Sequence, residues 1–375
     1  MDGRILLQPG STGVATYAWG LRRALALISE QPLTLIDRPG LSAAMPVSGS
    51  RGQRWVRALW PGTHEAVACD IGGEPLLVAL DIFRLAQVHF DVYRRALRIT
   101  ASGPPGVMHW TYPVPLVIEG WANLYTIHDV IPLLQPDLTP IDHVRHRRLL
   151  RAITDSAAAI VTVSDTSAAD IARTLGCAAD RIHNCGQAVD AEPSSASLPS
   201  QLTPKAYLLA LGSVERRKNL DRLIDAYVAS GATMPLVIAG PDGWQGIRSD
   251  KPGVVRLPYL PRELVRALIG QAKALLMPSL AEGFGLPVVE AMAMGTPVMT
   301  SRGGALEEIA GNAALLVDPR SIGDMATAIA RLAKDPGLEE ALSAAGLRNA
   351  RRFTLARFAE KLAPLYEEQF ARLRR

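Results

Sequence analysis

The chain has 375 residues, of which 48% are hydrophobic and 20% are charged, and its formal net charge is +4. This length exceeds one ordinary hydrophobic core and predicts about two domains, while the composition excludes wholesale disorder. The charge excess is too small and too diffuse for a nucleic-acid-binding surface, so we expect no nucleic-acid partner.

The sequence indicates a protein of the reducing cytoplasm. No apolar run approaches the roughly 18 residues that a membrane-spanning helix needs, and the first residues lack the pattern of a signal peptide. The three cysteines, Cys69, Cys177 and Cys185, cannot all pair and do not have the spacing of metal ligands. We therefore expect a cytoplasmic location.

The first half of the chain alternates short apolar runs with helical patterns, which is typical of βαβ units and parallel sheets. The pattern begins with a strand over Arg4–Gln8, a loop that ends at Gly13, and a helix over Val14–Ser29. Further strands are predicted over Leu33–Ile36, Leu76–Leu80, Val107–Trp110, Leu124–Ile127 and Ala159–Ser164, and a helix over Ser167–Leu175. Residues 39–75 have little periodicity and support no assignment.

A basic segment runs from His143 to Arg151 and contains Arg145, Arg147 and Arg148. If it is helical, it would expose a stripe of cations. Two interpretations stay open: a solvated helix face, or contact with anionic lipid or a lipid diphosphate.

A stretch rich in proline and serine over residues 191–204 predicts a linker between two domains. Beyond it the alternation of strands and helices restarts. We predict strands over Tyr207–Leu211, Leu236–Ala239, Val254–Leu257, Ala274–Met277 and Pro297–Thr300, and helices over Leu220–Ser230, Arg262–Gln271, Val288–Met294 and from Ile322 to Arg375. Two doubly wound α/β domains would face each other across a cleft, with ligands at the carboxyl ends of the strands.

The strongest chemical signal is the turn between the strand that ends near Pro278 and the next helix. The backbone amides of Phe284, Gly285 and Leu286 are expected at a helix N-terminus, where they can bind phosphate or another electron-rich oxygen. Glu282 and Glu290 lie on either side of this turn, and each carboxylate can accept a pair of sugar hydroxyls. The structural alternatives are that Glu282 is only a turn residue and that Glu290 only complements the helix dipole.

This run resembles the donor-site motif of the retaining glycosyltransferases of family 4, including bacterial mannosyltransferases that build exopolysaccharide or lipopolysaccharide. The resemblance implies a GT-B fold, with an acceptor-binding domain over residues 1–190, a nucleotide-sugar-binding domain over 205–350, and a helix over 351–375 that returns to the first domain. It also implies that Glu282 and Gly283 lie beside the transferred sugar, and that Glu290 binds the ribose.

Five other segments resemble the family's pattern, although many relatives have Arg where this chain has Ser213. Ser213, Arg217 and Lys218 follow a strand, and the two cations would stabilise the charge that develops on the leaving diphosphate. His128 and Asp129 would contact and orient the donor sugar, and Gly13 would approach the diphosphate. Tyr259 and Leu260 correspond to the region that reads the nucleobase. His109, Trp110 and Tyr112 are candidate acceptor contacts, with core packing as the alternative.

These residues predict a retaining transfer in which Glu282, His128, Arg217 and Lys218 are the catalytic groups. The sequence has no Asp-x-Asp pair, so we expect no metal and no other cofactor. The predicted donor is GDP-mannose, with UDP- or dTDP-sugars as alternatives, and the predicted acceptor is a glycan on a polyprenyl diphosphate at the cytoplasmic membrane face. A nucleotide-sugar epimerase and a non-catalytic sugar-nucleotide binder are the alternatives of another class.

Overall fold

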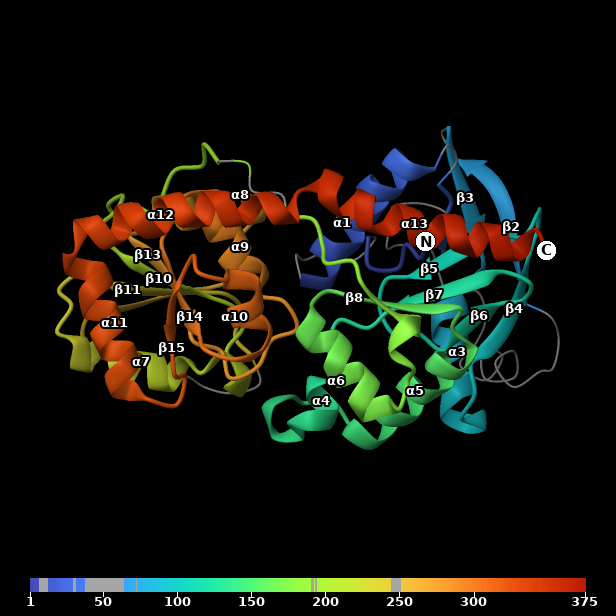
Figure 1. Ribbon diagram of the computed structural model, residues 1–375, viewed down its shortest axis with the longest axis horizontal. Coiled ribbons are helices and arrows are strands. Elements are labelled where there is room, and N and C mark those ends of the chain that lie inside the picture. The colour runs from blue at the N-terminus through green and yellow to red at the C-terminus, as the bar shows by residue number, and fades with distance from the viewer. Residues whose placement is uncertain are drawn as a thin grey trace.

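The computed structural model describes residues 1–6, 13–29, 32–37, 64–71, 73–189, 192, 194–243 and 251–375. Figure 1 shows two α/β lobes side by side, with the last helix running from one lobe onto the other. Both labelled chain ends lie on the lobe that contains the N-terminal residues.

The C-terminal domain is built on a parallel sheet with the order β12-β11-β10-β13-β14-β15 in the described residues. Its strands are β10 (Leu208–Leu211), β11 (Leu236–Ala239), β12 (Val254–Leu257), β13 (Ala274–Met277), β14 (Val298–Ser301) and β15 (Leu315–Val317). Its helices are α7 (Leu220–Ser230), α8 (Arg262–Gln271), α9 (Leu286–Ala293), α10 (Gly304–Ala310), α11 (Ile322–Lys334) and α12 (Pro336–Ala350). Strands β10, β11, β13 and β14 are buried at every residue, because helices cover both faces of a parallel sheet.

The described part of the N-terminal domain has two sheets, with the orders β1-β3-β2-β4-β6 and β5-β7-β8-β9. Only β2 and β3 pair antiparallel among these strands. The strands are β1 (Thr34–Ile36), β2 (His64–Ile71), β3 (Glu74–Val78), β4 (Leu97–Ala101), β5 (Val107–Trp110), β6 (Leu116–Ile118), β7 (Ala122–Thr126), β8 (Ala159–Thr162) and β9 (Ile182–Asn184). The helices are α1 (Gly13–Ile28), α3 (Ile82–Tyr93), α4 (Ile131–Leu134), α5 (His143–Ser156) and α6 (Asp165–Leu175).

A buried side chain, Asn123, connects the two N-terminal sheets where β6 and β7 separate. Its Oδ1 accepts hydrogen bonds from the Ile118 N–H at 3.0 Å and from the Trp110 indole at 3.1 Å. Its Nδ2 donates to the Ile118 carbonyl at 2.9 Å. This amide satisfies backbone groups at the point where the two sheets separate, which a continuous ladder would otherwise have paired.

The predicted strand over Arg4–Gln8 is wrong for its first three residues, which form a turn; residues 7 and 8 lie outside the described ranges. Pairing with β1 occurs earlier, through a parallel bridge between Asp2 and Leu35. The Asp2 carboxylate accepts the Thr111 N–H at 2.5 Å, which fixes the start of the chain. A Cβ at Gly3 would lie 2.6 Å from Thr34, so only glycine permits this close approach.

The last helix, α13 (Leu355–Leu373), belongs to the core of the N-terminal domain. Phe358 and Leu362 are almost completely buried and share one apolar cluster with Tyr17 and Leu21 of α1. Figure 1 shows α13 lying along this lobe after a break that separates it from α12. The two domains are therefore joined twice, by the segment before β10 and by the segment between α12 and α13.

Candidate active site

Glu282, in the loop after β13, forms ion pairs with both predicted cations. Its carboxylate accepts a hydrogen bond from Lys218 Nζ at 2.8 Å and another from Arg217 Nη1. The side chain is 9% exposed. Burial alone would raise its pKa, but Lys218 and Arg217 lower the pKa of Glu282 to about 2. Glu282 is therefore an anion at neutral pH and is unsuited to donate a proton.

The turn between β10 and α7 holds these cations in place. Asn219 adopts a left-handed backbone with φ of 59°, and its amide donates to the carbonyls of Pro278 at 3.0 Å and Pro319 at 2.7 Å. The carbonyl of Arg217 accepts the Leu280 N–H at 2.8 Å. Asn219 was not predicted as a site residue. It could have been found from its position directly after the two cations, because asparagine tolerates the left-handed conformation.

Ser213 lies in the same turn but is engaged with a neighbour. Its hydroxyl donates to the Glu215 carboxylate, which lies 3.5 Å from Arg217 Nη2. Gly212 has φ of +135°, and a Cβ there would come within 3.0 Å of Lys218 Cε. The glycine thus permits Lys218 to pass over the end of β10.

His128 and Asp129 follow β7 on the opposite side of the domain junction. The His128 Nε2 lies 3.0 Å from the Thr111 carbonyl, which only accepts, so Nε2 carries the proton and Nδ1 is the acceptor of the ring. Burial lowers the pKa of His128 to about 4, so its imidazole is neutral at pH 7. Burial raises the pKa of Asp129, against the N–H of Ile131 and the charge of Arg217, which lower it.

Gly283 brings the two halves of this site together. A Cβ at this position would lie 2.6 Å from the His128 carbonyl oxygen and 3.1 Å from Asp129 Cβ. The Gly283 carbonyl accepts hydrogen bonds from Ser164 Oγ at 2.8 Å and Ser167 Oγ at 3.2 Å. The loop that carries Glu282 is thus packed directly against the N-terminal domain, and glycine is required there.

A second contact across the junction joins α10 to the N-terminus of α6. Glu308 accepts hydrogen bonds from the Asp165 N–H at 2.7 Å, the Thr166 N–H at 2.8 Å and the Thr166 hydroxyl at 2.7 Å. Amides at a helix N-terminus have no intrahelical partner, and a carboxylate there is stabilised by the helix dipole. Glu308, Ser164 and Ser167 were missed by the sequence analysis, because their roles depend on how the domains meet.

Glu290 lies in α9, as predicted, and faces Arg262 of α8 with 3.7 Å between Oε1 and Nη2. Arg262 also donates to the Thr16 hydroxyl of α1 at 2.9 Å. Gly13 begins α1, and a Cβ there would lie 3.5 Å from Leu286, the first residue of α9. The N-terminal ends of α1 and α9 therefore approach each other from opposite domains.

The remaining predicted donor residues have different environments. Phe284 is 5% exposed and packs edge-on against Phe353, so its side chain belongs to the core and its backbone amide is the group left for a ligand. Gly285 is left-handed with φ of +99°, and a Cβ there would meet Leu306 at 2.5 Å. Tyr259 and Leu260 follow β12 at the edge of the sheet, and Tyr259 is 49% exposed.

The acceptor interpretation fails for His109 and Trp110, since both side chains have no exposed surface. His109 bonds to Tyr366 of α13 at 2.7 Å and to Thr126 at 2.8 Å, and Trp110 stacks on Tyr125. His109 and Trp110 therefore pack in the core, which was the alternative prediction. Tyr112 is half-buried, and its hydroxyl accepts a hydrogen bond from Arg4.

Residues 197–349 match the family of glycosyl transferases group 1. The chain is 34% identical over 250 residues to O-antigen chain mannosyltransferase B of Escherichia coli, an alignment that covers 61% of this chain and 66% of that protein. It is 27% identical over 289 residues to the serotype-specific mannosyltransferase WbdA of Escherichia coli, covering 70% of this chain and 35% of that protein. The chain thus spans about a third of the length of WbdA.

Among solved structures, Anabaena Alr3699/HepE in complex with UDP and glucose resembles this chain with a TM-score of 0.65. The match covers 96% of this chain and 97% of that one at 16% identity, and at this identity it shows a shared fold alone. The two facing α/β domains define the GT-B class, and the predicted fold is confirmed. Residues 197–349 thus form a glycosyl transferases group 1 domain.

Proposed function

We propose that this chain is a retaining glycosyltransferase that moves mannose from GDP-mannose to a glycan carried on a polyprenyl diphosphate. The observation that carries the proposal is the cluster of Arg217, Lys218 and Glu282, packed at the domain junction against His128. The mannosyltransferases among its relatives favour mannose as the transferred sugar. UDP- and dTDP-sugars are the alternative donors.

In the proposed reaction, the bond between the sugar and the diphosphate breaks while the acceptor oxygen forms a bond on the same face of the sugar. The acceptor's proton passes to the departing phosphate, which leaves as part of the nucleoside diphosphate. Arg217 and Lys218 would bind that phosphate, because cations held in place stabilise the charge as it develops. This role needs no metal ion.

Glu282 and His128 would act on the sugar itself. With its pKa near 2, Glu282 stays negative and would stabilise the positive charge on the sugar during transfer. Neutral His128 would accept a hydrogen bond from a sugar hydroxyl at Nδ1, because its Nε2 proton is held by Thr111. Neither residue is assigned as a covalent nucleophile.

We further propose that the enzyme meets its acceptor at the cytoplasmic membrane face. In the described part of the chain, no helix is long and apolar enough to cross a membrane. On α5, Val144, Arg148 and Arg151 are exposed and spaced on one helix face, and exposed Ile141 lies just before the helix. Arg145 is instead paired with Asp91 at 2.7 Å. Cations beside apolar side chains suit an anionic lipid surface.

The test is a panel of nucleotide sugars offered to the wild type and to Glu290→Ala, with EDTA present throughout. Thermal stabilisation reports binding, and mass-detected hydrolysis reports slow turnover in the absence of acceptor. We expect GDP-mannose to stabilise the wild type and to be hydrolysed, and Glu290→Ala to lose both responses. Glu340→Gln, an exposed change in the same domain, is the matched control and should behave as the wild type.

Each part of the proposal can fail separately. A UDP- or dTDP-sugar that outperforms GDP-mannose would replace the donor but keep the transferase. Activity that appears only when Mg²⁺ replaces the EDTA would overturn metal independence. If no nucleotide sugar or nucleoside diphosphate shifts the melting temperature at millimolar concentration, the donor site itself is wrong.

A further inference from the structure

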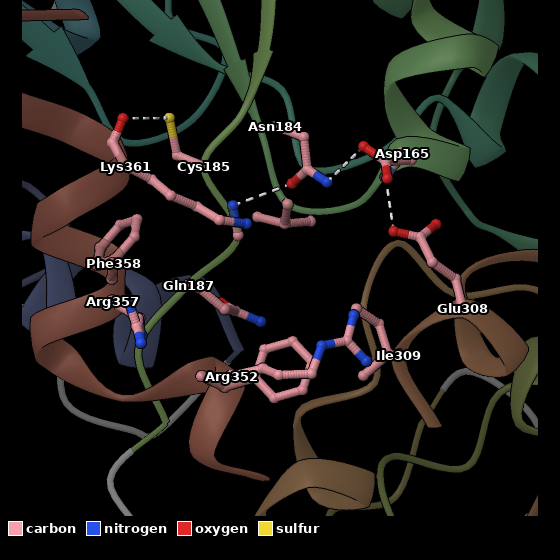
Figure 2. Close-up of a pocket in the computed structure, with 13 residues that line it drawn as sticks. Asp165, Asn184, Cys185, Gln187, Glu308, Ile309, Arg352, Arg357, Phe358 and Lys361 are labelled. Atoms are coloured by element: carbon pink, nitrogen blue, oxygen red, sulfur yellow. Dashed lines mark hydrogen bonds between the residues drawn. The ribbon is translucent and has the colours of Figure 1, made fainter. Parts of the chain in front are cut away.

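A pocket of about 80 Å³ lies between the domains, and its walls do not include Arg217, Lys218, Glu282, His128 or Glu290. Figure 2 shows its walls, which come from the β8–α6 turn, the segment after β9, α10 and the start of α13. One water needs roughly 10–15 Å³ of such volume, so the pocket can hold a group with several oxygen atoms.

Two polar side chains at this pocket have no partner within the described residues. Gln187 is 5% exposed, its amide is in no hydrogen bond there, and Figure 2 shows it pointing into the pocket. Lys361 extends from α13 along the pocket wall toward Asn184, and its ammonium is in no ion pair with the described chain. An amide in a buried residue is more stable when it is hydrogen-bonded, so this site favours a polar occupant.

The charged groups around the pocket favour an anion. Three cations line it: Lys361, Arg352, which lies over the Phe353 ring at 5.1 Å, and Arg357, whose partner Glu360 is an exposed helix neighbour. Two carboxylates also line it, but both are already hydrogen-bonded. Asp165 accepts from Asn184 at 2.7 Å, and Glu308 accepts the three hydrogen bonds from the start of α6.

We propose that this pocket binds a phosphate group, held by the Lys361 ammonium, the Arg352 guanidinium and the Gln187 amide. A tetrahedral oxyanion matches the volume, and charge-assisted hydrogen bonds to its oxygens would satisfy the side chains that lack partners. Because Arg352 lies in the segment that joins α12 to α13, whereas Gln187 and Lys361 belong to the N-terminal lobe, the bound group would hold the joining segment against that lobe. The phosphate belongs to a free small molecule or to a lipid diphosphate, and the experiment separates these sources.

The test is isothermal titration calorimetry with inorganic phosphate, and with farnesyl diphosphate as the lipid-borne form, in chloride buffer at constant ionic strength. Phosphate could also bind at Arg217 and Lys218, so the variants separate the two sites. Lys361→Gln and Arg352→Gln change the pocket, and Lys218→Gln changes the active site. Arg372→Gln, an exposed arginine farther along α13, is the matched control. Lys218 is only 12% exposed and pairs with Glu282, so melting temperatures would verify that its variant folds as the other three do.

We expect saturable binding to the wild type that Lys361→Gln and Arg352→Gln each weaken at least fivefold, while Arg372→Gln and Lys218→Gln leave it within twofold. Binding of phosphate alone would assign a small-molecule ligand, and binding of farnesyl diphosphate alone a lipid-borne one. The proposal is overturned if neither ligand binds at 20 mM, or if Lys218→Gln abolishes binding that Lys361→Gln retains. These outcomes do not depend on whether the chain transfers a sugar.

Discussion

The two domains hold their parts of the active site in different ways. In the C-terminal domain, Lys218 and Glu282 contact each other from loops that follow β10 and β13, two neighbouring strands of one sheet, and Asn219 joins these loops. In the N-terminal domain, His128 and Asp129 meet the rest of the site where Gly283 packs against them. The cluster of Arg217, Lys218 and Glu282 is therefore assembled within the C-terminal domain, whereas the complete site needs both domains docked.

The largest effect is expected within the C-terminal domain, from Lys218→Ala. Removing one preorganised cation should lower kcat about 10²–10³-fold, because it acts on the charge of the leaving group. Steady-state kinetics, with the donor that the nucleotide-sugar panel selects, would measure the loss. Lys273→Ala is the control, since Lys273 also pairs with a glutamate of this domain, Glu339, away from the site. Equal losses in both variants would contradict the assignment.

The next prediction concerns acid stability of the same cluster. The folded-state pKa of Glu282 is about 2, below its ordinary value of 4.5. Its ionisation therefore stabilises the fold above about pH 4.5, and this contribution is lost as pH falls toward 2. At full effect it amounts to about 3 kcal/mol.

Urea unfolding of the C-terminal domain from pH 6 to pH 3 would measure this effect. Glu282→Gln cannot titrate, so the free-energy difference between wild type and variant should shrink as the pH falls. A difference that stays constant across this range would show that the ion pairs do not set the pKa of Glu282.

A smaller effect is expected where the domains meet, from Gly283→Ala. The added methyl group would collide with the His128 carbonyl and displace the donor loop, and a shift of about 1 Å can cost about 10²-fold in kcat/KM. Gly323→Ala is the control, because that helical glycine has open space around it. Unchanged kinetics in Gly283→Ala would mean that the domains are not docked this closely during catalysis.

The smallest effect is expected from Glu308→Gln, which removes the charge that α6 binds. Charge-assisted hydrogen bonds contribute about 1.5–3 kcal/mol. We therefore expect this substitution to destabilise the docked domains, relative to separated ones, by about 1–2 kcal/mol. Small-angle X-ray scattering should then show a larger radius of gyration. Glu307→Gln is matched in chemistry, but Glu307 bonds to Gly303 of its own helix and should leave the shape unchanged.

The sequence predicted the C-terminal domain to within two residues at each strand between Tyr207 and Thr300. Its strands are short, buried and separated by helices with clear ends, so local patterns suffice. The pairing of Lys218 with Glu282 could also have been predicted from the sequence, since the two residues follow neighbouring strands of one parallel sheet. The N-terminal domain was harder, because β2 and β3 pair antiparallel within a region that has no clear period.

The parts that the sequence could not predict are contacts between distant segments. Ser164 and Gly283 are 119 positions apart, and Asp165 and Glu308 are 143 apart. Nothing in their local patterns indicates docking. Trp110 was misread for a related reason: a strand buried on both faces carries aromatic residues that look like a binding surface until the second face is known.

The return of α13 to the N-terminal lobe has a consequence for biosynthesis. Residues up to Val189 emerge from the ribosome without Phe358 and Leu362, which complete the apolar cluster around α1. At about 5–20 residues per second, the intervening segment takes roughly 10–30 s to synthesise. During that interval the nascent N-terminal lobe exposes the α1 face that α13 later covers, so chaperone binding is expected there, and the C-terminal lobe can finish folding first.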